Sequence, residues 1–247
     1  MDLPLTALPA PTGSPGLLLR LYRPVDQDRL PSVDAMLTVL DEDERLRADR
    51  TECGSARSAF VTGRYLLRRF TAELLDVDPR TMTAVSSCPS CAARGVTGPD
   101  HGRPGYLLGD AHVPLELSLS RSRGAVLLAA LPSGNGARTG VDLEAVDDVG
   151  FEGFADVALT PAEREAVREL PQESGLLARA RLWARKEALV KALGSGLTGR
   201  DPSTLDVLHD PRTGDVELPA PPRGAGAADG DEQGGLVAAV AVVPSSP

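Results

Sequence analysis

The first half of the chain carries apolar runs of two kinds. Short runs rich in Leu, Val and Ala predict three β-strands, over 16–22, 115–120 and 125–131. Apolar residues at helical spacing predict two helices, over 32–50 and 57–75. The second helix is expected to end before Asp78-Pro79, because a proline disfavours helical backbone at the residue before it. A stretch rich in turn-forming residues over 88–109 separates the helices from the later strands.

The second half repeats this order of elements. The pattern predicts strands over 139–146 and 236–243, a helix that begins at Pro161 and a longer helix over 176–193. Thr160 and Glu163 form a capping box at the start of the first of these helices, and Gly194 is placed to end the second. The recurrence predicts an internally duplicated architecture joined by the linker 132–136. The segment 219–235, rich in Pro, Gly, Ala and Asp, is expected to be a loop.

The composition narrows the function classes. The chain has 247 residues, 42% of them hydrophobic, which is enough for a substantial core. A net charge of -9 argues against general binding to nucleic acid or to anionic membranes, and three cysteines do not make a disulfide framework. No apolar run reaches the length of a membrane span, and the first residues do not resemble a signal peptide. We therefore expect a monomer in the cytoplasm.

Two carboxylates are expected to share one face of the strand over 139–146. Residues two apart in a strand point to the same side, so Asp142 and Glu144 lie together. Magnesium prefers oxygen ligands, often one or two carboxylates completed by water and phosphates. Two solvated acids at a strand end would give the same pattern, and for this pair alone that reading is favoured.

A second group of charges lies on the predicted helix over 176–193. Glu187 and Lys191 are four residues apart and share a face with Trp183, which by itself describes an ordinary surface ion pair. If the helix packs on the sheet, however, Glu187 becomes a third acid beside Asp142 and Glu144. Three acids with Lys186 and Lys191 suggest a site for a metal-bound diphosphate.

Two sequence motifs resemble a known family. Residues 140–144 read Gly-Val-Asp-Leu-Glu, and residues 183–197 read Trp-Ala-Arg-Lys-Glu-Ala-Leu-Val-Lys-Ala-Leu-Gly-Ser-Gly-Leu. This pair resembles the two signature motifs of the phosphopantetheinyl transferases, in particular the surfactin-type class, which has two similar halves in one chain. Smaller features of that class are Gly-Arg-Pro at 102–104, Ser-Leu-Ser at 118–120, and Arg57 and Arg64 on the first long helix. The resemblance covers about 43–197, and the repeated order of elements extends it to both ends.

The resemblance implies an α+β fold. It consists of a pseudo-duplicated pair of halves, each a small, mainly antiparallel sheet packed on a long helix, with the active site between them. Residues 1–134 would form the half that binds the nucleotide end of coenzyme A. Residues 135–247 would form the half with the magnesium and catalytic motifs.

The resemblance also implies a reaction. The 4'-phosphopantetheine group of coenzyme A would pass to a serine of an acyl or peptidyl carrier protein. The serine hydroxyl attacks the β-phosphorus and 3',5'-adenosine bisphosphate leaves. Asp142, Glu144 and Glu187 would hold magnesium, Glu187 would also be the candidate base, and Lys191 would neutralise the leaving phosphate. Coenzyme A would be bound by Arg57, Arg64, Arg103, Ser120, Arg121, Lys186 and Lys191.

One position departs from the family pattern. The class commonly has histidine in a Ser-His-Ser strand end, whereas this chain has Arg121 between Ser120 and Ser122. Arginine also binds phosphate through forked, permanently charged donors, so the anion-binding role would survive. We expect coenzyme A affinity to lack a histidine-like inflection between about pH 5 and 7 from this position. Alternatively, Arg121 points to solvent and Arg64 or Arg103 holds the phosphate.

Other interpretations stay open from the sequence alone. Cys88 and Cys91, with His101 nearby, have the spacing of three zinc ligands, and Cys53 or His112 would have to supply the fourth. The chain would otherwise be a non-catalytic module that binds coenzyme A or a carrier, or a magnesium-dependent transferase with another substrate.

Overall fold

Three small antiparallel sheets and seven α-helices make up the part of the chain that the structure describes. The structure is a computed structural model, and it describes residues 3–51, 54–96, 101–194, 196, 200–220 and 235–245. The first sheet contains, in spatial order, β1 (Thr6–Leu8), β2 (Leu18–Tyr22), β7 (Ala125–Pro132) and β6 (Leu115–Ser122). The second contains β8 (Ala137–Ala145), β10 (Leu236–Pro244) and β9 (Thr213–Val216). The third contains β3 (Met82–Ser87), β4 (Arg103–Leu108) and β5 (Ala111–His112).

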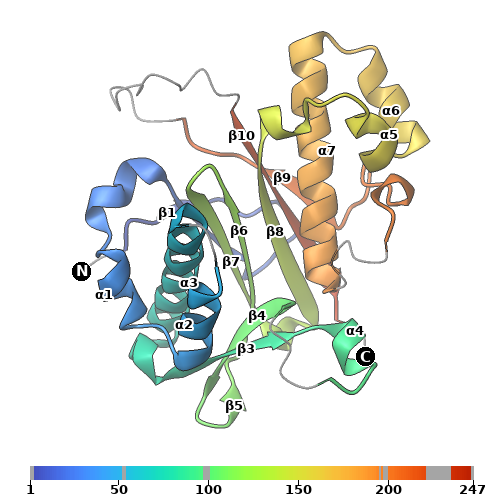
Figure 1. Cartoon of the computed structure of the whole chain (residues 1–247). Helices are drawn as coiled ribbons and strands as arrows, with labels where there is room; N and C mark the ends of the chain where they lie inside the picture. Colours follow the sequence, from blue (N-terminus) through green and yellow to red (C-terminus); the bar gives the residue numbers. More distant parts are fainter. Residues whose placement is uncertain are drawn as a thin grey trace.

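The helices lie on two sides of these sheets (Figure 1). On one side are α1 (Val33–Leu37), α2 (Glu42–Asp49) and α3 (Gly54–Leu75), and on the other are α5 (Phe154–Ala158), α6 (Pro161–Arg168) and α7 (Gln172–Leu193). The short helix α4 (Pro89–Ala92) follows β3. The long helices α3 and α7 have 22 residues each; α3 accompanies the first sheet and α7 the second. The α+β class with small antiparallel sheets is therefore confirmed. None of the described helices is both long and apolar enough to cross a bilayer.

Strand β8 connects the two sides of the molecule. Its Val141 and Leu143 join an apolar cluster with residues of β2 and β7, such as Leu19 and Leu127. The alternate residues of β8 face α7, and Gly140 allows the helix to approach closely. A Cβ at Gly140 would lie 2.1 Å from the carbonyl oxygen of Ala188 in α7. This close packing brings the acids of β8 next to the charged side chains of α7.

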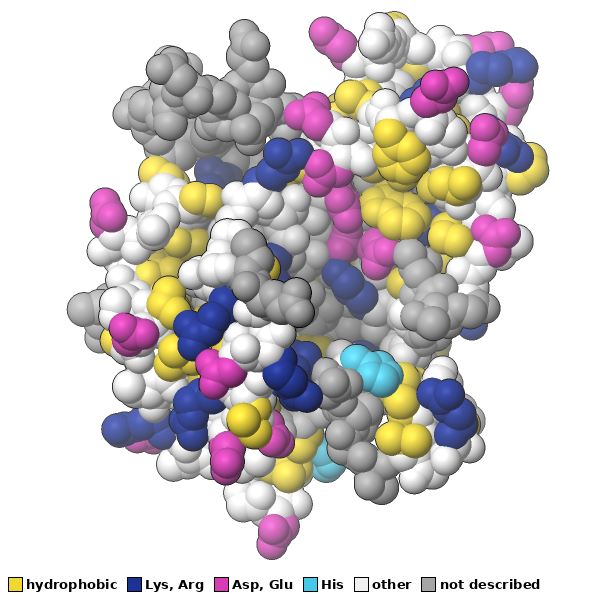
Figure 2. Space-filling model, in the orientation of Figure 1, with side chains coloured by type: hydrophobic (Ala, Val, Ile, Leu, Met, Phe, Trp, Pro, Cys, Tyr) yellow, Lys and Arg dark blue, Asp and Glu magenta, His cyan; other side chains and the backbone are white. Residues whose placement is uncertain are grey.

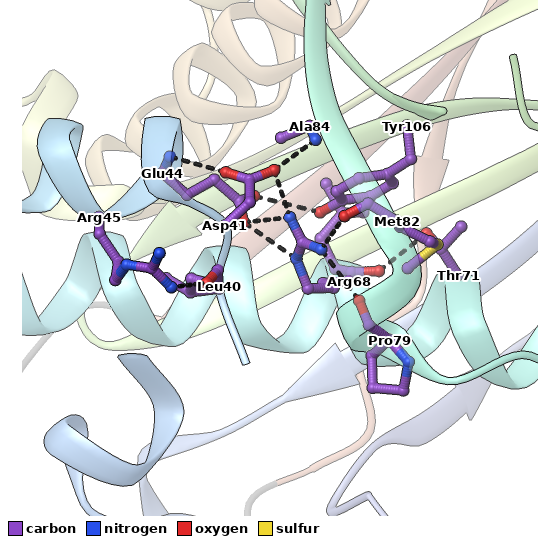
Figure 3. A network of polar contacts seen from close by, with 11 residues as sticks. Leu40, Asp41, Glu44, Arg45, Arg68, Thr71, Pro79, Met82, Ala84 and Tyr106 are labelled. Carbon is purple, nitrogen blue, oxygen red and sulfur yellow. Dashed lines mark hydrogen bonds and ion pairs between the residues drawn. The ribbon is translucent and has the colours of Figure 1, made fainter. Parts of the chain in front are cut away.

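The helix predicted over 32–50 is in fact two helices, α1 and α2. Asp41 begins α2 as its N-cap, and its side chain accepts a hydrogen bond from the backbone N–H of Glu44. Asp41 and Glu44 both pair with the fully buried guanidinium of Arg68 in α3, at 2.7 Å each. Figure 3 shows this network, in which Arg68 also donates to the carbonyl oxygens of Pro79 and Met82. The break in the helix therefore serves a buried ion-pair network that fixes α2 against α3.

Most other predicted elements are confirmed, with shifted ends. The capping box of Thr160 and Glu163 is present, and Gly194 ends α7 in left-handed conformation. The linker over 132–136 contains a short 3-10 turn, Ser133–Asn135, directly between β7 and β8. The turn-rich stretch over 88–109 contains α4 and β4, which the sequence did not predict, and β1, β3, β5 and β9 were also not predicted. Most of the predicted loop over 219–235 lies outside the described residues.

Candidate active site

Lys191 of α7 lies at the centre of a three-residue polar contact. Its Nζ is 2.6 Å from Oδ1 of Asp142 in β8 and 3.1 Å from Oγ of Ser120 in β6. The Ser120 hydroxyl donates to the same Asp142 oxygen at 2.8 Å. Asp142 is 2% exposed, whereas the Lys191 side chain is 32% exposed. One end of the ion pair is therefore buried and the other opens to solvent.

Two serines connect β6 to β8 at this place. The two strands belong to different sheets, so no backbone ladder joins them. Instead, Oγ of Ser118 accepts a hydrogen bond from the backbone N–H of Val141, and Ser120 bonds to Asp142. Because Ser118 and Ser120 point to the same side of β6, the Ser-Leu-Ser pattern holds the seam between the two larger sheets.

The site contains more acid than its one lysine balances. Burial and the carboxylates of Asp142 and Glu187 raise the pKa of Glu144 to about 7. Burial, followed by Asp142, also raises the pKa of Glu187 above its ordinary value, and Lys191 opposes this shift. Oδ2 of Asp142 is buried without a hydrogen-bond partner among the described residues. Such an arrangement favours a bound cation, because a cation would relieve the repulsion and satisfy the free oxygen.

A cleft of about 520 Å³ extends from this centre toward the other half of the chain. Glu187, Lys191 and Ser120 line one end of the cleft. The remaining described residues that line it are Arg47, Phe60, Arg64, Gly102, Arg103, Pro104, Ser118, Leu119, Arg121, Val190, Gly194 and Gly196. On the face shown in Figure 2, basic side chains gather on the side of α2 and α3, and acidic side chains gather near α7.

Three guanidinium groups surround one aromatic ring in this cleft. The Cζ atoms of Arg47, Arg64 and Arg121 lie 5.4, 5.7 and 5.9 Å from the ring centroid of Phe60. Burial, Arg64 and Arg47 together lower the pKa of Arg121 from its ordinary value. Arginines held this close repel one another, so the cluster is suited to an anion with several charges.

Arg103 adds a fourth guanidinium to the cleft. Its Nε and Nη1 are buried without a hydrogen-bond partner among the described residues. Nη1 lies 3.8 Å from a carboxylate oxygen of Glu116, which is too long for a hydrogen bond. Burial, followed by the charge of Arg138, lowers the pKa of Arg103. These unsatisfied donors are available to a ligand in the cleft.

Two predicted coenzyme A residues are not brought to the cleft. Lys186 is fully buried, and its Nζ contacts Glu163 at 2.6 Å and the carbonyl oxygens of Ala158 and Pro202. The reason is helical geometry, because Lys186 and Lys191 are five residues apart and so point about 140° away from each other around the helix. Arg57 pairs with Asp49 at 3.0 Å and is not among the residues that line the cleft. For these two residues, the structure does not support the predicted placement.

Arg47 and Phe60 also line the cleft, although the sequence did not indicate them as site residues. Arg47 lies one turn after Glu44 on α2, so the Arg68 network sets its position. Phe60 lies one turn before Arg64 on α3, and this spacing places an aromatic ring beside a guanidinium. The spacing from Phe60 to Arg64 was visible in the sequence. The contribution of Arg47 was not, because it depends on how α2 packs against α3.

Glu144 faces a second hollow next to the acids. This hollow of about 460 Å³ is lined by Glu144, Asp148, Val149, Phe151, Phe154, Val157, Ala158, Trp183 and Pro202. Phe154 packs edge-on against both Phe151 and Trp183. Phe151 is 57% exposed, so an apolar surface borders the acidic centre at Glu144.

Comparison with known proteins assigns this arrangement to a family. Residues 138–220 match the model of the 4'-phosphopantetheinyl transferase superfamily. The chain is 31% identical over 183 residues to the 4'-phosphopantetheinyl transferase HetI of Nostoc sp. (strain PCC 7120 / SAG 25.82 / UTEX 2576), over 72% of this chain and 70% of that relative. The chain belongs to the 4'-phosphopantetheinyl transferase superfamily. It is therefore an enzyme of a family that uses coenzyme A to modify carrier proteins, as the motif pair predicted.

The family match covers both sequence motifs. The matched segment includes Asp142 and Glu144 of β8 and Glu187 and Lys191 of α7. The phosphopantetheinyl transferase assignment therefore coincides with the acidic end of the cleft. The surfactin-type subclass stays a prediction.

Proposed function

We propose that this phosphopantetheinyl transferase is of the surfactin type and transfers the 4'-phosphopantetheine group of coenzyme A to a serine of an acyl or peptidyl carrier protein. The observation that carries the proposal is the division of charge in one cleft. Arg47, Arg64 and Arg121 lie together around Phe60, and Glu187 lines the other end with Lys191. Coenzyme A has one phosphate on its ribose and a diphosphate between nucleoside and pantetheine, so it has an anion for each end.

The arginine cluster is the proposed site for the 3'-phosphate. Arg64 and Arg121 lie on different elements, α3 and β6, and meet over one ring. Guanidinium groups bind phosphate through paired donors. Nε and Nη1 of Arg103, which have no hydrogen-bond partner among the described residues, supply more donors in the same cleft. In this arrangement Arg121 serves the role that the family commonly gives to histidine, and it does so without titrating near neutral pH.

The acidic end is the proposed magnesium site. Asp142, Glu144 and Glu187 offer carboxylate oxygens, which suit a hard cation. Two observations support this proposal: Oδ2 of Asp142 is buried without a hydrogen-bond partner among the described residues, and the pKa of Glu144 is raised by burial and by the neighbouring acids. When bound, magnesium would neutralise charge on the diphosphate and orient it. The two oxygens of Asp142 then have separate tasks, because Oδ1 already holds Lys191.

The proposed chemistry assigns a task to each nearby side chain. Glu187 accepts the proton of the carrier serine hydroxyl, and its raised pKa makes it a stronger base than an ordinary carboxylate. The serine oxygen forms a bond to the β-phosphorus while the bond to the bridging oxygen breaks, and 3',5'-adenosine bisphosphate leaves. Lys191, held by Asp142 and Ser120, balances the charge that develops on the leaving phosphate.

The apolar hollow beside Glu144 is the proposed entry for the carrier serine. Its lining includes Glu144 and the exposed Phe151 and none of the arginines that line the cleft. A serine that enters there meets the acids without crossing the nucleotide end of the cleft. Aromatic side chains that border a site in this way are common anchors of protein partners.

The same charge division supports the two-domain interpretation, with boundaries 1–134 and 135–247. One apolar cluster runs from Tyr22 to Ala130, and a second runs from Val146 to Val243. A third cluster, such as Leu19 with Val141, draws on both halves. In this division the arginines belong to the first half and the acids to the second.

The test is a transfer assay on the full chain. The enzyme is incubated with coenzyme A, magnesium and apo forms of acyl, polyketide and nonribosomal-peptide carrier proteins, and the intact mass of each carrier is measured. We expect a phosphopantetheine adduct on at least one carrier, and its loss when EDTA removes magnesium. An adduct that forms at the same rate in EDTA would contradict the magnesium site, and no adduct on any carrier would contradict the proposed reaction.

A further inference from the structure

Three side chains with soft or borderline ligand atoms meet outside the active site. They are Cys88, immediately before α4, Cys91 within it, and His101, two residues before the start of β4. Their ligand atoms all lie within 4.8 Å of one another. Among the described residues, no other three His, Cys, Asp or Glu side chains come this close together, and the three acids of the active site lie farther apart than this. Both thiols are free and buried, whereas His101 is exposed.

The backbone around these residues holds the ligands in place. The ladder between β3 and β4 pairs Ser87 with Arg103, so it closes the loop that contains all three ligands. Gly102 has a φ of 106°, and a Cβ there would lie 2.3 Å from the carbonyl oxygen of Ser87. Only glycine permits this close return of the chain beside Cys88. The pairing of β3 with β4 and the tight turn at Gly102 therefore bring Cys88 close to His101.

The distances fit a tetrahedral metal. Sγ of Cys91 lies 3.3 Å from Nε2 of His101. Ligands at about 2.3 Å for sulfur and about 2.0 Å for nitrogen in a tetrahedral zinc site lie roughly 3.5 Å apart. Two thiolates and an imidazole favour zinc over magnesium, which prefers oxygen.

We propose that Cys88, Cys91 and His101 bind Zn²⁺, with water in the fourth position on the exposed side of His101. The proposed zinc site lies next to Gly194 and Arg103, two residues that line the active-site cleft. A Cβ at Gly194 would lie 3.1 Å both from Pro89 of α4 and from Nε of Arg103, so the zinc loop packs against the end of α7.

The test measures metal content of untagged enzyme purified without chelator. We expect about one zinc per chain, and after exchange with cobalt an absorption band from thiolate-to-cobalt charge transfer. Cys91→Ser is expected to lose the metal and the band. His112→Asn, which alters a histidine in β5 outside the cluster, should keep both. Chelation should lower the Tm of the wild type and leave the Tm of Cys91→Ser unchanged.

A second variant covers the case in which Cys91→Ser does not fold. His101→Asn alters the exposed ligand, and we expect it to fold and to bind zinc at least tenfold more weakly. Reduced protein without bound zinc and without a cobalt band would overturn the proposal. A chain mass lower by two hydrogens, which shows a disulfide between Cys88 and Cys91, would overturn it as well.

Discussion

Helix α7 presents two lysines to two different environments. Lys186 has three ammonium donors and three acceptors within 2.8 Å, namely Glu163 and two carbonyl oxygens, and it is fully buried. Lys191, five residues later, has Asp142 and Ser120 as partners and is partly open to the cleft. Both lysines belong to the same sequence motif, yet only one faces the other charged groups of the cleft.

The surroundings of the two lysines indicate that Lys186 has a structural role and that Lys191 belongs to the ligand-binding centre. The Glu163 carboxylate that meets Lys186 also accepts hydrogen bonds from the backbone of Thr160 and Val207, so this ion pair joins α6, α7 and the segment that follows. Around Lys191, one Asp142 oxygen has no hydrogen-bond partner in the part of the chain that the structure describes, and Glu144 and Glu187 have raised pKa values. A satisfied buried pair holds the fold, whereas an unsatisfied one is prepared for ligands.

The largest effect is expected on stability, when the buried ion pair of Lys186 and Glu163 is broken. Lys186→Met leaves the Glu163 carboxylate buried without its charge partner, so it should lower the free energy of unfolding by about 3–5 kcal/mol. Denaturant unfolding measures this change. Arg181→Met, on an exposed turn of the same helix with a loose ion pair to Asp215, should cost less than about 1 kcal/mol.

A double variant sharpens the same prediction. Adding Glu163→Gln to Lys186→Met removes the uncompensated charge, so part of the lost stability should return. If Lys186→Met is as harmless as Arg181→Met, the structural role of Lys186 is wrong.

A smaller effect is expected when the arginines of α3 are replaced, and it concerns the binding of coenzyme A. Arg64 faces the cleft, whereas Arg57, two turns earlier, pairs with Asp49 on the surface. Arg64→Ala should raise the KM for coenzyme A about tenfold or more, as the loss of a hydrogen bond to a charged group would. Arg57→Ala should change this KM less than about twofold. Steady-state kinetics at fixed carrier concentration compares the two, and equal effects would argue against the proposed phosphate site.

The smallest effect is a dependence of stability on pH. The pKa of Glu144 is raised from 4.5 to about 7, so the folded protein keeps a proton that the unfolded protein releases. Stability without metal should therefore fall as pH rises from about 4.5 to 7, and Glu144→Gln should flatten this slope. Thermal unfolding in EDTA across this range measures it. An unchanged slope in Glu144→Gln would mean that Glu144 does not titrate as its surroundings require.

Much of the fold followed from periodicity and end signals. The long helices, the central strands and the capping box of Thr160 and Glu163 were predicted because each depends on neighbours in sequence. The break at Asp41 was not predicted, since it depends on Arg68, which lies 27 residues later. Strand β4 was missed because it lies in the stretch rich in turn-forming residues, and β3 was missed because it is short and its pairing with β4 is not local.

The residues of the candidate site, like the elements of the fold, were predicted only in part. Motif positions located Asp142, Glu144, Glu187 and Lys191, and the structure brings these four together. A motif does not record which side of a helix meets the cleft, so it also included Lys186. Partners from other elements decide that point, as the contacts of Lys186 with Glu163 and Pro202 show.

The most direct test of the unsatisfied centre is Glu187→Gln, with stability and transfer measured on the same preparation. The substitution removes a negative charge from a group of acids that repel one another, so the Tm without metal at pH 8 should stay the same or rise. It also removes the proposed base, so transfer to an apo-carrier should fall by about 100-fold or more. Normal transfer, or a loss of stability as large as that of Lys186→Met, would contradict the account.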